Sequence, residues 1–202
     1  MSRIDDLGEP PSPDGRDVLT PPSRIEWRRW LASNHDREEG LWIVYRKKSS
    51  SLDGPVYADL VEEALCFGWI DSRMRRIDED RVVQWFSPRR DGGLWSALNK
   101  DRIARLTTAG HMTGVGQAVI DRAKTDGSWS QLDDVDALIV SPDLQAALEA
   151  APEAMAAYEN LGDSVKKQYL WSIYSAKRPA TRAGRIEATV RTLSPEGGSG
   201  SS

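Results

Sequence analysis

Ala64–Ser72 reads ALCFGWIDS, and the fold of the first half of the chain depends on this stretch. It closes a segment, 57–67, whose apolar residues recur on one side at helical spacing, which predicts an amphipathic helix. Gly68 is the residue type that commonly ends a helix. A strand pattern starts at once and predicts a strand over 69–77. A helix that turns directly into a strand indicates a mixed fold, and such a junction tends to face a cleft.

Further strands and a helix are predicted on either side of this junction. Leu41–Lys48 (LWIVYRKK) is dense in β-branched and aromatic residues on both alternating faces, which is typical of a strand covered on both sides. A second extended run, 81–86, follows 69–77 after three acidic residues, and the pair predicts a hairpin although its turn lacks glycine. Residues 23–35 open with a capping box, SRIE, which predicts the start of a helix.

The periodicity becomes helical after the glycines at 92 and 93 and stays helical through the second half of the chain. Ser141, Ser164 and Thr181 are expected to cap three of the helices. The predicted helices cover about 94–108, 113–124, 142–149, 152–161, 164–176 and 181–193. The fold class is therefore α+β, an N-terminal mixed strand-and-helix module followed by an all-helical C-terminal part.

The chain divides into two folded parts between polar ends. Residues 1–22 carry prolines and lack periodicity, so we expect a disordered arm, and 194–202 (SPEGGSGSS) predicts a disordered tail. An α+β module is expected over 23–130 and a helical domain over 141–193, with the boundary in the acidic stretch between them.

Composition excludes several classes of function. The net charge of -4 argues against wholesale nucleic-acid binding, although residues 164–193 are basic and 126–163 acidic, so that the two blocks can pair with each other. One cysteine and two histidines leave no disulfide and no metal site to expect. Because the first fifteen residues resemble no export signal and no apolar run is long enough to span a membrane, we expect a cytoplasmic protein.

The junction supplies the first candidate ligand-binding residues. Trp69 offers a flat apolar face, and Asp71 is predicted to share a strand face with Arg73 and Arg75 by period-two alternation. A small anionic or aromatic ligand fits this chemistry. The alternative is that Trp69 fills the core, Asp71 pairs with Arg73, and Cys66 is a small core residue rather than a nucleophile.

A second candidate is the loop Phe86–Trp95 (FSPRRDGGLW), where two glycines precede a predicted helix. The free N–H groups of a helix N-terminus attract anions, and Arg89 and Arg90, with Trp85 beside them, strengthen that interpretation. The spacing of a phosphate loop or a dinucleotide fingerprint is missing. A solvated, flexible loop is the alternative.

The third candidate is a basic, aromatic segment near the C-terminus. Lys177, Arg178, Arg182 and Arg185 lie on a predicted helix, turn and helix and form a candidate partner-binding surface. A helix-turn-helix reader of DNA would look partly similar, but the second helix lacks base-reading Asn and Gln residues and its neighbour is acidic.

Two motifs, ALCFGWIDS at 64–72 and SAKRPATRAGRI at 175–186, resemble the YdeI/OmpD-associated family, also called the bacteriocin-protection family. The resemblance extends over about 24–193. It implies a part in protecting bacteria against bacteriocins and cationic antimicrobial peptides. The family name also associates it with an outer-membrane porin. It implies no cofactor and no catalytic residue. Shorter pieces that also fit are WxxWL at 27–31, NH at 34–35, YRKK at 45–48, FSPRR at 86–90, WSxxN at 95–99 and DGSW at 126–129.

Three hypotheses follow. The first is a cytoplasmic stress-protection protein that binds a small anionic or aromatic ligand, or a partner, in one cleft formed by the 69–73 strand and the Arg89/Arg90 loop. The second is an enzyme that uses Asp71 as general base and an arginine to hold the substrate. The third, weaker hypothesis is a nucleic-acid or protein platform on the basic C-terminal helices. The oligomeric state stays open.

Overall fold

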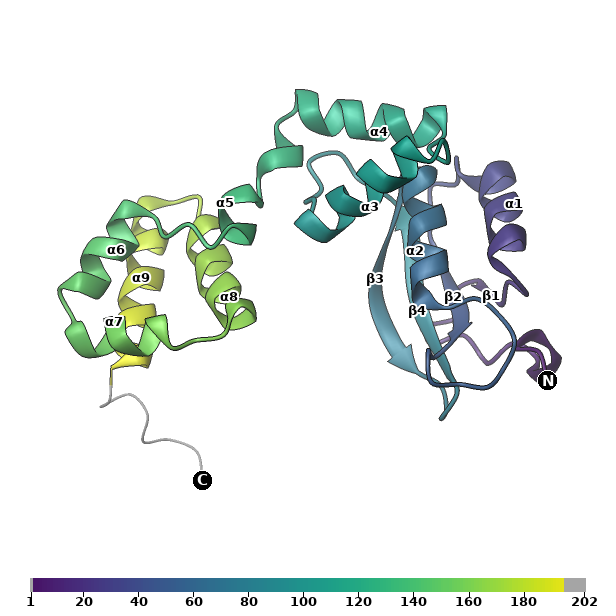
Figure 1. The fold of residues 1–202 in the computed structure, drawn as a ribbon, viewed down its shortest axis with the longest axis horizontal. Helices are drawn as coiled ribbons and strands as arrows, with labels where there is room; N and C mark the ends of the chain where they lie inside the picture. The colour runs from purple at the N-terminus through teal and green to yellow at the C-terminus, as the bar shows by residue number, and fades with distance from the viewer. Residues whose placement is uncertain (1, 195–202) are drawn as a thin grey trace. The chain divides into compact units, whose positions relative to one another are not determined.

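The computed structural model describes residues 2–194 and divides into two compact units, up to Ser130 and from Gln131 onward. The predicted α+β class is confirmed, because the first unit holds a four-stranded sheet and the second unit is helical (Figure 1). Within the described residues, no helix is long and apolar enough to cross a bilayer.

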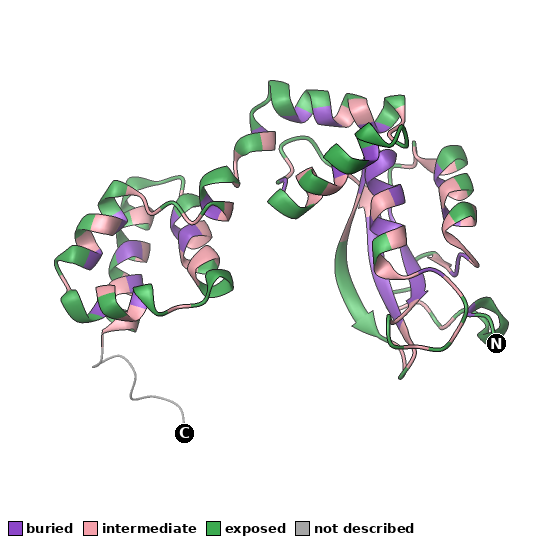
Figure 2. Cartoon of the chain, viewed as in Figure 1, coloured by how far each residue is buried: buried purple, intermediate pink, exposed green. Residues whose placement is uncertain are grey.

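The sheet has the order β1-β2-β4-β3. β1 (Val18–Leu19) runs parallel to β2 (Leu41–Arg46), and β2 runs antiparallel to β4 (Arg81–Pro88). β4 forms the predicted hairpin with β3 (Trp69–Arg76), which is the edge strand. Figure 2 shows that β2 and β4 are largely buried, whereas β3 is exposed along most of its length.

Two helices cover one face of this sheet. α1 (Arg24–Asn34) begins where Ser23 Oγ accepts a hydrogen bond from Glu26 N at 3.2 Å, as the capping box predicted. α2 (Tyr57–Cys66) ends before Gly68, whose φ of 75° lets the chain reverse into β3. The apolar sides of both helices join the sheet in one core, whose fully buried members include Trp27, Leu31, Ile43, Leu60 and Phe86.

The N-terminal arm differs from the disordered segment expected over 1–22. It holds a 3-10 helix, η1 (Asp5–Leu7), and β1, and Ile4 is fully buried. Ile4 packs with Trp42, Val44 and other residues on the second face of the sheet. Apolar residues scattered among prolines carry no periodic signal, so their burial depends on a sheet face that forms far along the chain. Of the tail predicted over 194–202, residues 195–202 lie outside the described residues.

Two further helices complete the first unit. α3 (Ala97–Thr108) and α4 (Gly114–Thr125) pack against α2, and the 3-10 helix η2 (Ser128–Ser130) follows α4. The helix expected over 94–108 begins at Ala97, three residues later than predicted, and Ser96 is its N-cap.

The second unit consists of α5 (Asp133–Asp136), α6 (Pro142–Glu149), α7 (Pro152–Glu159), α8 (Asp163–Tyr174) and α9 (Pro179–Leu193). The helices enclose a core of their own, which includes Leu144, Leu148, Ala154 and Ile173. The caps expected at Ser164 and Thr181 are wrong. α8 starts one residue before Ser164, and α9 starts at a proline, which fits the first helical turn because its missing N–H would lack a helical partner there.

Candidate anion-binding site

A groove of about 630 Å³ lies at the end of the sheet where β3 begins and β4 ends. This volume is within the roughly 300–1,000 Å³ typical of small-molecule sites. Glu38 and Glu39 are the acidic residues of its wall. Four arginines and one indole define what we call the arginine groove: Arg16, Arg73, Trp85, Arg89 and Arg90. The arginines outnumber the glutamates, so the groove favours an anion.

The prediction that the side chains of Asp71 and Arg73 share one strand face is wrong. In the β3–β4 register Asp71 faces Phe86 and Met74 faces Gln84, so two residues of β3 lie opposite the single residue between them on β4. This β-bulge reverses the alternation after Asp71. Arg73 therefore lies on the groove side of the sheet, over Trp85, whereas Asp71 lies on the other.

Asp71 belongs to a hydrogen-bonded cluster of its own. Its Oδ2 accepts hydrogen bonds from Tyr57 Oη at 3.1 Å and from Gln84 Nε2 at 2.5 Å, and Tyr45 Oη donates to Gln84 Oε1 at 2.7 Å. Burial, and then the charge of Asp71, raises the pKa of Tyr57. Asp71 is not among the residues that line the arginine groove.

Trp69 is a core residue in the structure. Its side chain is fully buried, and its indole Nε1 donates to the backbone oxygen of His35 at 2.9 Å. The ring meets Trp30 edge to face at 5.8 Å between centroids. An indole that is buried and hydrogen-bonded in this way has no face left for a ligand. Trp69 therefore fits the alternative in which it fills the core.

Arg73 and Arg16 converge on Trp85 from distant parts of the chain. Their guanidinium carbons lie 5.7 Å and 5.0 Å from the indole centroid, within the range of cation–π contacts. Asp14 Oδ2 lies 3.8 Å from Arg73 Nη2, and Asp14 Oδ1 accepts a hydrogen bond from Trp42 Nε1 at 2.8 Å. Sequence reasoning missed Arg16 and Asp14, because it treated the arm as disordered.

Arg89 has the most unusual environment in the groove. Its guanidinium stacks on Trp95 at 3.6 Å from the ring centroid, and Nη1 donates to the backbone oxygen of Leu94 at 3.0 Å. Nε and Nη2 are both buried, and neither has a hydrogen-bond partner among residues 2–194. Burial lowers the pKa of Arg89 to about 10, although the charge of Asp71 acts in the opposite direction. Neighbouring Arg90 is exposed.

The glycine loop does not act as the open helix terminus that its sequence suggested. Ser96 Oγ accepts from Asn99 N at 3.4 Å and so caps α3 from within the chain. Gly92 N donates to Asp126 Oδ2 at 3.3 Å. The arginine side chains of this loop, rather than its amides, are therefore its candidate donors for an anion.

Cys66 is a buried residue of the core. Burial raises the pKa of its thiol above the usual value, with a smaller opposing effect from Arg28. A raised pKa disfavours the thiolate, which is the nucleophilic form. Cys66 therefore fits the role of a small core residue better than that of a nucleophile. No group of three His, Cys, Asp or Glu side chains suited to a metal occurs in the described part of the chain.

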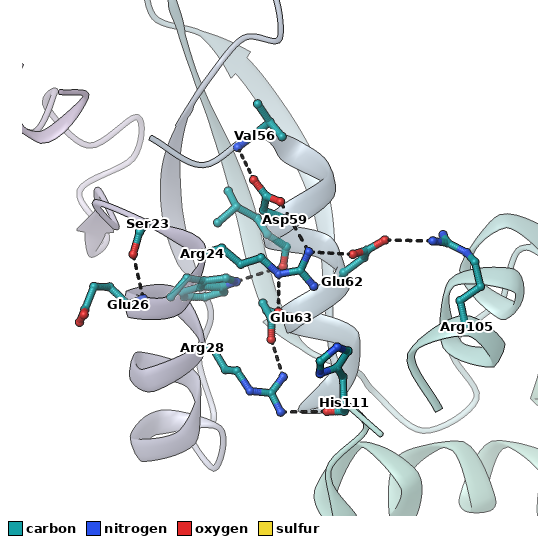
Figure 3. A network of polar contacts seen from close by, with 12 residues as sticks. Ser23, Arg24, Glu26, Arg28, Val56, Asp59, Glu62, Glu63, Arg105 and His111 are labelled. Carbon is teal, nitrogen blue, oxygen red and sulfur yellow. Dashed lines mark hydrogen bonds and ion pairs between the residues drawn. The ribbon is translucent and has the colours of Figure 1, made fainter. Parts of the chain in front are cut away.

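A second groove, between α1, α2 and α3, is occupied by ion pairs of its own (Figure 3). Glu63 is buried, and its carboxylate accepts from Arg24 Nε at 2.6 Å and from Arg28 Nη1 at 2.5 Å. Arg28 also donates to the backbone oxygen of His111, and Arg105 pairs with Glu62. Because these charges satisfy one another, the network joins helices rather than presenting a site.

The basic residues near the C-terminus divide into two groups. Arg182 donates to both carboxylate oxygens of Asp143, at 2.6 and 2.8 Å, and Arg185 donates to Ser175 Oγ at 3.0 Å. These bonds connect α9 with α6 and with the end of α8. Lys177 and Arg178 are exposed in the turn before α9. Of the candidate partner-binding residues, only this second pair is therefore directed away from the helical core.

Two family profiles match separate parts of the chain. Residues 19–119, half of the 202 residues, match a family described as a domain of unknown function, DUF8412. The chain belongs to the DUF8412 family. Residues 137–194 match the family described as bacteriocin-protection, YdeI or OmpD-associated, which confirms the resemblance seen in the sequence. No curated protein and no solved structure gave a match.

The extent of that resemblance is narrower than the sequence suggested. The motif at 175–186 lies within the bacteriocin-protection match, whereas the one at 64–72 lies within the DUF8412 match. The arginine groove is built from residues of the first unit, and all but Arg16 lie in the DUF8412 segment. The match to the bacteriocin-protection family therefore lies in the helical unit, whereas the candidate site lies in the first unit.

Proposed function

We propose that this protein is a cytoplasmic stress-protection protein that binds a small anionic ligand in the arginine groove. The helical unit gives the link to bacteriocin protection, and the first unit supplies the ligand site. The observation that carries the proposal is Arg89, two of whose nitrogens are buried without an acceptor among residues 2–194. An unpaired buried donor costs roughly 1–3 kcal/mol, and more when it is charged, so an acceptor that reaches it is strongly favoured.

The sign of the charge restricts how protection works. Arg73, Arg89 and Arg90 are among the residues that line the groove, and a cationic antimicrobial peptide would meet like charges there. The groove therefore does not capture such a peptide directly. Protection through this site instead uses an anion made inside the cell, and cell fractionation followed by immunoblotting tests the cytoplasmic location.

Binding of inorganic phosphate and of benzoate, measured by calorimetry and by tryptophan fluorescence, tests the ligand site. Arg89→Gln and Arg90→Gln should each weaken binding about tenfold or more, because each removes a charge-assisted contact of about 1.5–3 kcal/mol. Arg29→Gln is the matched control, since Arg29 is an exposed arginine on α1 away from the groove. Equal affinity of all four proteins would refute the proposal, and thermal melts identify any variant that fails to fold.

The cellular part of the proposal is tested by survival. A strain that lacks the gene should lose survival under a bacteriocin or a cationic peptide, and the wild-type gene should restore it. Arg90→Gln, which changes an exposed residue, should restore less than Arg29→Gln at equal protein level. Full protection by Arg90→Gln would separate the groove from the phenotype.

No observation favours the enzyme or the nucleic-acid hypothesis over this one. Asp71 and Arg73 lie on opposite sides of the sheet, so Arg73 does not hold a substrate against Asp71 as general base. Arg182 and Arg185 already bond within the helical unit.

A further inference from the structure

The outer edge of β3 has no strand of residues 2–194 beside it. Among the described residues β3 pairs with β4 alone, and the five residues Ser72–Arg76 are exposed. Figure 2 shows this edge as a continuous exposed ribbon. Such an edge presents unpaired backbone N–H and C=O groups that can pair with another extended chain.

The bulge sorts the side chains of this edge onto two faces. Arg73 and Arg75 both lie over Trp42, with guanidinium carbons 5.4 and 5.9 Å from the ring, so they share one face. Met74 lies between them in sequence, is 58% exposed, and takes the opposite face by alternation. The edge therefore alternates between a cationic and an apolar position.

The positive charge on this edge is only partly compensated. Arg75 has no ion pair within residues 2–194, and the ion pair of Arg73 with Asp14 is long, at 3.8 Å. Arg76 pairs with Glu79 at the exposed hairpin turn. Arginines and bulges protect sheet edges from unselective pairing. The same arginines favour pairing with an acidic strand, because its carboxylates would neutralise their charge.

We propose that β3 binds an extended acidic peptide by strand addition, with carboxylates at alternate positions facing Arg73 and Arg75 and an apolar side chain facing Met74. This inference goes beyond the proposed function and shares only Arg73 with the arginine groove, because Met74 and Arg75 are not among the residues that line it. A second copy of this chain is excluded as the occupant, because pairing two β3 edges would bring like charges together, which destabilises a cross-strand pair.

The test uses the full chain and a labelled peptide of alternating glutamate and valine, followed by fluorescence anisotropy. The control peptide has the same side chains with N-methyl groups on alternate amides, which removes backbone donors and keeps the charge. Strand addition predicts that the methylated peptide binds at least about tenfold more weakly, because main-chain bonds supply much of the affinity in this mode. It also predicts slower hydrogen exchange of the β3 amides in the complex.

Charge reversal provides the second arm. Arg75→Glu should weaken peptide binding at least about tenfold, while Arg29→Glu, an equal charge change on α1, should have little effect. Equal binding of the two peptides, or unchanged binding by Arg75→Glu, overturns the inference. If phosphate binds and neither peptide does, the inference fails and the proposed function stands. If phosphate, benzoate and both peptides all fail to bind, both proposals fail.

Discussion

Replacing Trp69 and Arg73 separately by alanine distinguishes the core from the groove at two positions of β3 that are four residues apart. Trp69 is fully buried, so Trp69→Ala should lower the free energy of unfolding of the first unit by about 3–5 kcal/mol. The backbone oxygen of His35 also loses its donor. Arg73 has a side chain that is 56% exposed and a carboxylate no closer than 3.8 Å, so Arg73→Ala should cost less than about 1 kcal/mol.

Urea unfolding followed by tryptophan fluorescence measures this difference. Seven of the eight tryptophans lie before Gln131, so the signal reports on the first unit. With a denaturant slope of about 2 kcal/mol per molar, the midpoint should fall by about 1.5–2.5 M in Trp69→Ala and by less than about 0.5 M in Arg73→Ala. Arg73→Ala should nevertheless weaken anion binding. A midpoint as low as that of Trp69→Ala would make Arg73 a structural residue and remove it from the site.

Three further outcomes are expected. Glu63→Gln should lower the free energy of unfolding of the first unit by about 2–3 kcal/mol in urea, because two arginines of α1 lose a buried partner; an unchanged midpoint would contradict this. Hydrogen bonds from Arg182 hold the pKa of Asp143 below its usual value. That stabilisation is therefore present above about pH 4 and lost as the pH falls further, and Asp143→Asn should flatten the acid dependence of melting followed by circular dichroism. Gly116→Ala should lower the melting temperature strongly, since its Cβ would lie 2.2 Å from a backbone oxygen of α2. Gly184→Ala is the control on α9, where the added Cβ would meet no atom of residues 2–194 within 4 Å apart from its own helical turn, so this change should be neutral or stabilising by up to about 1 kcal/mol.

Most helices and strands were predictable because their signals are local. The hairpin of β3 and β4, the capped start of α1 and the proline start of α6 each follow from neighbours within a few residues. The arm was not predictable in this way. Ile4 is buried only because a sheet face is completed by strands some forty and eighty residues later in the chain.

The candidate site was predicted in part. Arg73, Trp85, Arg89 and Arg90 line one groove, and their role in binding a ligand stays a prediction. Trp69 and Asp71, which the same reasoning added, lie elsewhere. Periodicity of two assigns faces correctly only while the register is regular, and the bulge after Asp71 breaks it.

The sequence by itself determined the order of helices and strands, the α+β class and the family resemblance of the helical unit, since these depend on local periodicity and on motifs. Only the tertiary structure decided which side of the sheet each residue of β3 occupies and that Arg16 joins the groove. It also decided that Arg89 keeps two buried nitrogens that have no partner within the part of the chain the structure describes. The physical reason is that register, burial and hydrogen-bond satisfaction depend on residues far apart in the chain, which no local pattern records.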